Sequence, residues 1–317
     1  MHIPDGFLSG RVIGASAILA VGGLGFALRQ ARQTLPPRRI PLMGLAAAFV
    51  FAAQMVNFPV AGGTSGHLLG GVLSAVLLGP SAAVVVLTAV VMVQCLMFAD
   101  GGVLALGANV FNMGIVGPVG GYGVYRLVRW IGRGRRGLVW AAAFAGWASM
   151  VMASISCAGQ LALSGTVAWS LVFPAMINVH MLIGLGEGLV TALILVAIVR
   201  VRPELLADEP VPGGSIEIRG VVGYGLLLAA GLALFVAPFA CPWPDGLEKV
   251  AASLGIQVRG QTTSQLPSLF PDYHLPGLGS AVWGTAWAGL IGTMVAFGLA
   301  WLLALALVPK GETGKPF

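Results

Sequence analysis

Long uninterrupted apolar stretches are the feature that most restricts how this chain of 317 residues can fold. Hydrophobic residues make up 57% of the sequence and charged residues only 9%, and the mean hydropathy is +0.93. A helix needs about 20 apolar residues to cross the hydrocarbon core of a bilayer, which is roughly 30 Å thick. The sequence therefore predicts a polytopic, all-α membrane protein that contacts lipid.

Nine stretches are apolar enough to be predicted as transmembrane helices. They comprise residues 12–28, 41–57, 67–79, 82–98, 103–125, 138–162, 180–199, 220–240 and 280–308. The stretch at 67–79 is the weakest prediction because it is short. Residues 163–179 are a candidate re-entrant segment.

The basic residues predict the orientation of these helices. With the N-terminus outside, fourteen of the 17 Lys and Arg residues fall on the cytoplasmic side: Arg29, Arg32, Arg38, Arg39, Arg126, Arg129, Arg133, Arg135, Arg136, Arg200, Arg202, Arg219, Lys310 and Lys315. Only Arg11, Lys249 and Arg259 fall outside. This asymmetry is the one that the positive-inside rule describes. The net charge of +6 is thus explained by topology, and we expect no nucleic-acid partner.

The chain is predicted to divide at a linker. Residues 203–218, "PELLADEPVPGGSIEI", contain Pro, Gly and four acidic residues, a composition typical of linkers. We expect a seven-helix membrane domain at 1–202 and a two-helix accessory domain at 219–317. The accessory domain carries a polar outer loop at 241–279, which is long enough to be functional or to dock on a neighbour.

The first ten residues, "MHIPDGFLSG", contain no Lys or Arg, unlike the start of a secretory signal peptide. We therefore expect the mature chain to begin at Met1 with a free amine. The Met1 amine, the His2 amide nitrogen and the His2 Nδ1 atom can then close five- and six-membered chelate rings around one ion. A planar set of nitrogens favours Ni(II) or Cu(II), whereas Zn(II) prefers tetrahedral ligands.

The best candidate for the fourth planar ligand is His67 in "NFPVAGGTSGHLLGG". The glycines before it indicate an outer loop that leads directly into a helix, so we expect His67 at the helix start. The alternative interpretation is a histidine that caps or packs against that helix.

Several polar residues interrupt the apolar helices: Gln94, Asp100, Asn109, Asn112, Asn178, His180 and Glu187. Polar groups within a membrane are costly, so each needs a partner or a function. One possibility is hydrogen bonding between helices. The other is orientation of the metal ligands, for which the candidates are Ser65, Asp100 and Asn109.

Small residues on the first helix, which include Ala15 and Ala17, allow close helix packing. These small residues either pack against other helices of the chain or contact another membrane subunit.

Four motifs together resemble one family. "MHIPDGFL" at the start, "GGTSGHLLGG" around His67, "FADGGVLALGANVFNMG" at 98–114 and "HMLIGLGEGLVTA" at 180–192 resemble the substrate-capturing M component of nickel and cobalt energy-coupling-factor transporters. "WPDGLEKVAASLG" at 243–255 is similar to the small N component of the PDGLE type. The resemblance covers nearly the whole chain as an M–N fusion.

The resemblance implies a metal site made of the Met1 amine, the amide and side-chain nitrogens of His2, and His67. It implies capture of Ni(II) on the outer face of a prokaryotic cell membrane, without a cofactor. It also implies a transmembrane coupling subunit and ATP-binding cassette ATPases as partners, with Ala15 and Ala17 favoured as a contact surface. No Walker A sequence occurs in this chain, so we expect separate subunits to hydrolyse ATP.

Three alternatives remain open at this point. The first is Co(II) uptake for cobalamin synthesis by the same mechanism, although members linked to cobalt typically resemble "HIMEGFLP" at the first motif. The second is a membrane enzyme that uses Glu187 and His180, and the third is a structural membrane protein. We further expect the loop at 241–279 to load the metal site without supplying ligands.

Overall fold

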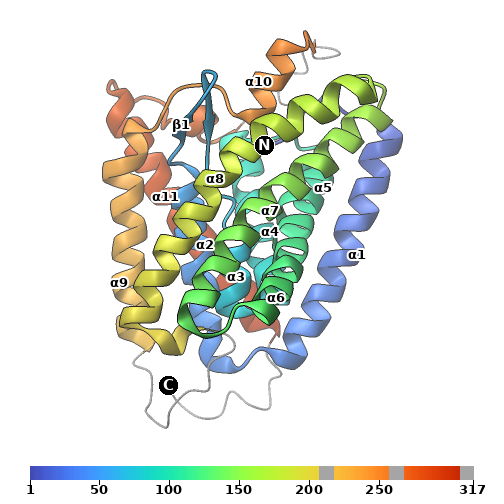
Figure 1. Cartoon of the computed structure of the whole chain (residues 1–317). Coiled ribbons are helices and arrows are strands. Elements are labelled where there is room, and N and C mark those ends of the chain that lie inside the picture. The colour runs from blue at the N-terminus through green and yellow to red at the C-terminus, as the bar shows by residue number, and fades with distance from the viewer. Residues whose placement is uncertain (207–217, 257–267, 308–317) are drawn as a thin grey trace.

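The computed structural model describes residues 1–206, 218–256 and 268–307. The helices run side by side in an elongated bundle, and the N-terminus lies at one end, which we call the N-terminal end (Figure 1). A hairpin of β1 (Phe58–Val60) and β2 (Thr64–Gly66) forms the only sheet in this part of the chain. Most of the predicted linker at 203–218 lies outside the described residues, as do Arg259, Lys310 and Lys315.

The predicted all-α membrane fold is confirmed. We use first domain as a name for residues 1–206 and second, or accessory, domain for the described residues from 218 on. The first domain contains α1 (Gly10–Thr34), α2 (Ile40–Gln54), α3 (Gly71–Leu78), α4 (Pro80–Phe98), α5 (Leu106–Asn109), η2 (Val110–Gly120), α6 (Gly121–Ile131), α7 (Gly134–Leu163) and α8 (Trp169–Val201). The second contains α9 (Ile218–Gly231), η4 (Leu232–Val236), η5 (Ala237–Phe239), α10 (Gly246–Ser253) and α11 (Ala281–Leu307). Short 3₁₀ turns are η1 (Pro37–Arg39), η3 (Pro203–Leu205) and η6 (Pro271–Tyr273).

Each of the nine predicted stretches contains helix, and six described helices are long and apolar enough to cross a membrane: α1, α4, α7, α8, α11 and the continuous helix Ile218–Phe239. The number of spans therefore stays a prediction. Nearly every residue of α4 is buried, because α1, α2, α3, η2 and α11 surround it. The accessory domain packs on the first domain mainly through α9 and α11 against α2.

Two predicted segments differ from the structure. In the stretch 67–79 the helix begins only at Gly71, because Gly70 adopts a left-handed φ of 75° and Gly79 ends the helix with a φ of 90°. The resulting eight-residue helix α3 is too short to cross a bilayer. The candidate re-entrant segment 163–179 does not form a separate element. From Trp169 on, its residues belong to α8, which continues unbroken to Val201.

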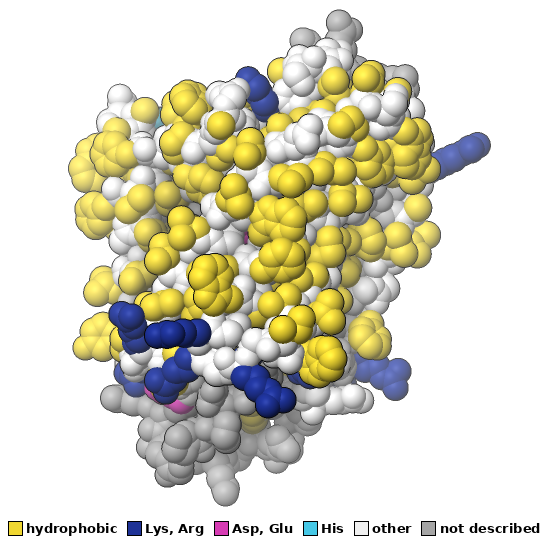
Figure 2. Space-filling model, in the orientation of Figure 1, with side chains coloured by type: hydrophobic (Ala, Val, Ile, Leu, Met, Phe, Trp, Pro, Cys, Tyr) yellow, Lys and Arg dark blue, Asp and Glu magenta, His cyan; other side chains and the backbone are white. Residues whose placement is uncertain are grey.

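Basic side chains gather at the end of the bundle opposite the N-terminal end (Figure 2). Arg32 lies in the last turn of α1, Arg129 in the last turn of α6 and Arg200 in the last turn of α8. Arg11 and Lys249, by contrast, lie in helices that start at the N-terminal end. Among the described residues, the basic side chains are therefore unevenly divided between the two ends of the folded bundle, as expected from the sequence.

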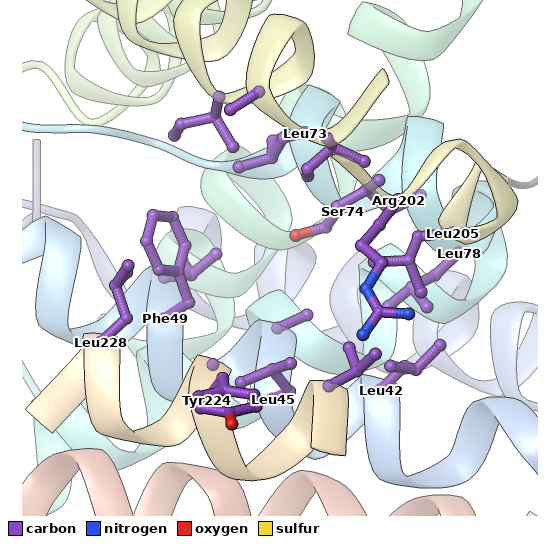
Figure 3. Close-up of a pocket in the computed structure, with 18 of the residues that line it drawn as sticks. Leu42, Leu45, Phe49, Leu73, Ser74, Leu78, Arg202, Leu205, Tyr224 and Leu228 are labelled. Carbon is purple, nitrogen blue, oxygen red and sulfur yellow. The ribbon is translucent and has the colours of Figure 1, made fainter. Parts of the chain in front are cut away.

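A cavity of about 460 Å³ lies between the two domains (Figure 3). Residues of α2, α3, α8 and α9 line it, and apart from Ser74, Arg202 and the Tyr224 hydroxyl the lining is apolar. Such walls offer almost no ligands to a hydrated metal ion, so the metal site must be sought elsewhere.

Candidate metal centre

The N-terminal segment is inserted into the bundle rather than exposed. Ile3 is fully buried, and its N–H donates to the Asn109 side chain at 2.8 Å while its carbonyl accepts from Asn109 Nδ2 at 3.0 Å. The Asp5 carboxylate accepts from the backbone N–H groups of Leu104 and Ala105 at 2.9 and 3.3 Å. A Cβ atom at Gly102 would lie 2.0 Å from the Asp5 carboxylate, so this approach requires glycine. These contacts fix the position of Met1 and His2.

The β1–β2 hairpin and the segment after it position His67. Gly62 and Gly63 have φ values of 84° and 71° and form the turn. His67 lies four residues before α3, so the prediction that it starts a helix is wrong; the left-handed Gly70 delays that helix. The buried carboxylate of Glu187 on α8 accepts the N–H groups of Leu69 and Gly70, which anchors the segment that carries His67.

The Met1 amine and the His67 ring meet inside the protein. The amine nitrogen lies 3.2 Å from His67 Nε2. On the other side of the ring, Nδ1 lies 3.1 Å from the Leu68 carbonyl. Because a carbonyl only accepts, Nδ1 carries the hydrogen and Nε2 presents its lone pair to the amine. This is the tautomer that a metal ligand at Nε2 requires.

The His2 ring stacks on the His67 ring, with centroids 5.7 Å apart. Its Nδ1 lies 2.9 Å from an Asp100 carboxylate oxygen and its Nε2 lies 3.0 Å from Gln94 Oε1. Gln94 in turn donates to Gln54 at 2.7 Å. Asp100 thus contacts His2, but in this arrangement it occupies the ring nitrogen that a chelate would use.

The accessory domain reaches this site directly. Asp245 forms an ion pair with the Met1 amine at 2.5 Å. The docking that places it there uses the N–H and the hydroxyl of Ser65, which donate to the carbonyls of Pro244 and Trp243 at 2.8 and 2.7 Å. Asp245 also caps α10 through a capping box with Glu248.

A second contact comes from the same domain. The Tyr273 hydroxyl donates to Asp100 Oδ2 at 2.5 Å, while the other oxygen of Asp100 faces His2. Sequence reasoning found neither Asp245 nor Tyr273 as a site residue. The only available signal was that the loop 241–279 shares the outer face with His2 and His67.

The electrostatics of the site follow from this burial and pairing. Burial disfavours the charged Met1 amine, but the Asp245 carboxylate outweighs burial and holds the pKa of the amine above its ordinary 8.0. Burial opposes ionisation of Asp245 as well, but the ammonium group holds the pKa of this carboxyl well below its usual range. Burial and the adjacent amine lower the pKa of His67 to about 3. His67 is therefore neutral at pH 7.

Side chains alone do not make a metal site here. Across the described residues, no group of three or more His, Cys, Asp or Glu side chains could hold an ion. A metal site at this position would have to include nitrogens that are not side-chain atoms, such as the Met1 amine. The two alanines predicted to contact a membrane partner lie on α1. Ala15 is exposed, whereas Ala17 packs against Gly107 of α5 within the chain.

Comparison with known families agrees with the resemblance found in the sequence. A family described as "Cobalt uptake substrate-specific transmembrane region" (CbiM) matches residues 2–205. A second, the PDGLE domain, matches residues 219–308.

Individual relatives cover both halves of the chain. A protein of Archaeoglobus fulgidus, named as a fused nickel transport protein NikMN, is 37% identical over 306 residues, which span 96% of this chain and 98% of that protein. The fused nickel transport protein NikMN of Rhodobacter capsulatus is 33% identical and covers 87% of this chain and 84% of its own length. A crystal structure of a truncated transition metal transporter is 32% identical with a TM-score of 0.58, covering 63% of this chain and 99% of that one.

Proposed function

Because this chain belongs to the CbiM family of transmembrane metal-uptake proteins and carries a C-terminal PDGLE domain, we propose that it captures Ni(II) for an ATP-driven importer of the energy-coupling-factor type. The transported ion is bound by the Met1 amine, the His2 amide nitrogen, His2 Nδ1 and His67 Nε2. Co(II) uptake through the same nitrogen ligands is the second candidate.

The observation that carries this proposal is the separation of 3.2 Å between the Met1 amine and His67 Nε2. Two nitrogens that each lie about 2 Å from one ion, at right angles, are about 2.9 Å apart. The two groups are thus already close to the spacing of neighbouring ligands. The His67 tautomer supports the same assignment, because its lone pair faces the amine.

Binding requires three local changes. The amine loses its proton to solvent and exchanges Asp245 for the ion. The His2 amide gives up its N–H proton to solvent so that its nitrogen can bind, and the His2 ring releases Asp100 so that Nδ1 can close its chelate ring. Asp100 is then free to accept from the bound imidazole or from water, while Tyr273 still holds its other oxygen. Since Asp245 and Tyr273 both belong to the accessory domain, movement of that domain and loading of the metal are coupled.

We place the N-terminal end outside the cell and the end rich in Arg on the cytoplasmic side, as the positive-inside rule requires. A coupling subunit in the membrane and separate ATPase subunits then drive release of the ion inward. The exposed side of α1, which includes Ala15, is the proposed contact for the coupling subunit. Glu187 is not a candidate catalytic acid, because both of its oxygens bind backbone N–H groups.

The test is metal content and uptake measured together. The purified full chain is dialysed against equal concentrations of Ni(II) and Co(II), and each metal is counted per chain by mass spectrometry. We expect about one Ni(II) per chain, in excess over Co(II), and uptake in cells only when the coupling and ATPase subunits are present. Protein that retains neither metal would refute the proposal, and excess Co(II) would favour the second candidate.

A further inference from the structure

His180 on α8 has a buried ring nitrogen that no described group satisfies. The residue is 1% exposed, and its Nε2 has no hydrogen-bond partner. Its Nδ1 lies 2.8 Å from the Met176 carbonyl, which only accepts, so Nδ1 carries the hydrogen and Nε2 a lone pair. A buried polar atom without a partner costs about 1–3 kcal/mol. Its presence therefore needs an explanation.

The surroundings of His180 connect it to the metal centre. A void of about 10 Å³ is lined by His180 together with Met1, His67, Met150 and Asp245. A space of this size holds about one water molecule and is too small for a hydrated ion. His180 Nε2 is not among the groups that contact the Met1 amine, which are Asp245 and His67 in the described structure. The lone pair thus lies beside the four proposed ligands without belonging to them.

The accessory domain covers this nitrogen. A Cβ atom at Gly246, the first residue of α10, would lie 2.7 Å from His180 Nε2. The helix can therefore close over the imidazole only because residue 246 lacks a side chain. Displacement of α10 would expose this lone pair to the void that Met1 also lines.

We propose that His180 is a transfer ligand, which binds the incoming ion before the four-nitrogen site is complete. This inference rests on the proposed function. His180 Nε2 displaces one water from the hydrated Ni(II), and is itself displaced when the Met1 and His2 nitrogens bind and release their protons. Each exchange forms one metal–nitrogen bond and breaks one existing bond to the metal, and no electron is transferred.

A transfer ligand has a kinetic signature that a permanent ligand lacks. It lowers the barrier between the free and bound ion in both directions, so its loss slows association and dissociation alike. The dissociation constant is unchanged, because the final ligands are the same. A permanent ligand, or a residue that orients one, would instead lower affinity, with losses of about 10- to 100-fold when such orienting contacts are removed.

The test uses His180→Asn in the full chain, because asparagine keeps a donor for the Met176 carbonyl and removes the Nε2 lone pair. Association of Ni(II) is followed by stopped-flow, and release by transfer to an excess of chelator. We expect both rates to fall about tenfold, with a dissociation constant within about twofold of the wild type. His274→Asn is the matched control, because that histidine lies against Gly284 of α11, and it leaves both rates unchanged.

The outcomes separate the two proposals. Unchanged rates in His180→Asn would overturn the transfer role, as would faster release with a large loss of affinity. Wild-type protein that retains no Ni(II) would instead refute the proposed function. If His180→Asn fails to fold, His180→Gln serves as the second variant, and the same parallel slowing is expected because an amide is a poorer ligand for Ni(II) than imidazole.

Discussion

Replacing Asp245 with Asn tests how the accessory domain controls the metal site. Asparagine has the same shape and can still accept the Glu248 N–H that Asp245 Oδ1 accepts at 2.8 Å, so α10 stays capped. The ion pair with the Met1 amine at 2.5 Å is lost. An unpaired buried charge costs about 3–5 kcal/mol, whereas shedding a proton from an amine of pKa 8 at pH 7 costs only about 1.4 kcal/mol. The amine in the variant is therefore neutral.

The variant should release fewer protons when it binds metal. In the wild type, the raised pKa of the Met1 amine means that Ni(II) must displace a proton at pH 7. In Asp245→Asn that proton is already absent, so the variant releases about one proton fewer per ion. His67 contributes to neither count, because its pKa of about 3 leaves it neutral. Calorimetry in buffers of different ionisation enthalpy measures this difference directly.

The pH dependence of stability provides a second readout. The amine has a raised pKa, so its contribution to the stability of the metal-free protein is lost as the pH rises through that value. Asp245 has a lowered pKa, so its contribution is lost as the pH falls through that value. The wild type should therefore be more stable than Asp245→Asn at pH 7 by about 1–3 kcal/mol, and this difference should shrink as the pH rises through the raised pKa of the amine.

The control is Asp272→Asn, which removes an exposed carboxylate of the same domain at a left-handed position that asparagine tolerates. Equal proton release by the wild type and Asp245→Asn would show that the ion pair does not hold a proton on the amine.

Three further predictions concern the ligands, the entry of the N-terminal segment and the domain organisation. His67→Ala should lose most Ni(II) binding by equilibrium dialysis with little change in the thermal midpoint, whereas His274→Ala should bind normally; equal losses would mean that the wrong histidine is assigned. Gly102→Ala should weaken Ni(II) binding at least tenfold, because its Cβ would lie 2.0 Å from the Asp5 carboxylate and displace the N-terminal segment; normal affinity would show that this approach is not required. Removal of residues 203–317 should leave equilibrium binding nearly unchanged while uptake in cells falls sharply; loss of bound metal in folded truncated protein would mean that the accessory domain completes the ligand set.

Much of the fold was predictable because the length of each apolar stretch can be read directly from the sequence. Every predicted stretch contains helix, yet the start of α3 was missed. It depends on the left-handed backbone of Gly70, and a glycine within an apolar stretch does not by itself reveal its φ angle. The start of α8 was missed for a related reason, because Pro174 suggests a break although the helix continues through it.

The site was predictable only in part. Met1, His2 and His67 lie together as the motifs indicated, and Asn109 and Asp100 contact the N-terminal segment. Asp245 and Tyr273 could not be found, because they contact Met1 and Asp100 from 244 and 173 residues away along the chain, through docking of one domain on another.

The most direct test is the insertion of one leucine before His2, which is too large to allow removal of Met1 and so shifts the histidine to third position and moves the terminal amine. The Met1 amine is buried between Asp245 and His67, so the added residue disrupts both contacts and changes the chelate ring pattern. Ni(II) uptake is then measured in cells that contain the coupling and ATPase subunits, with the chain quantified in membranes. We predict that uptake falls to background while the chain remains in the membrane. Normal uptake by the extended chain would contradict a metal site built on the terminal amine.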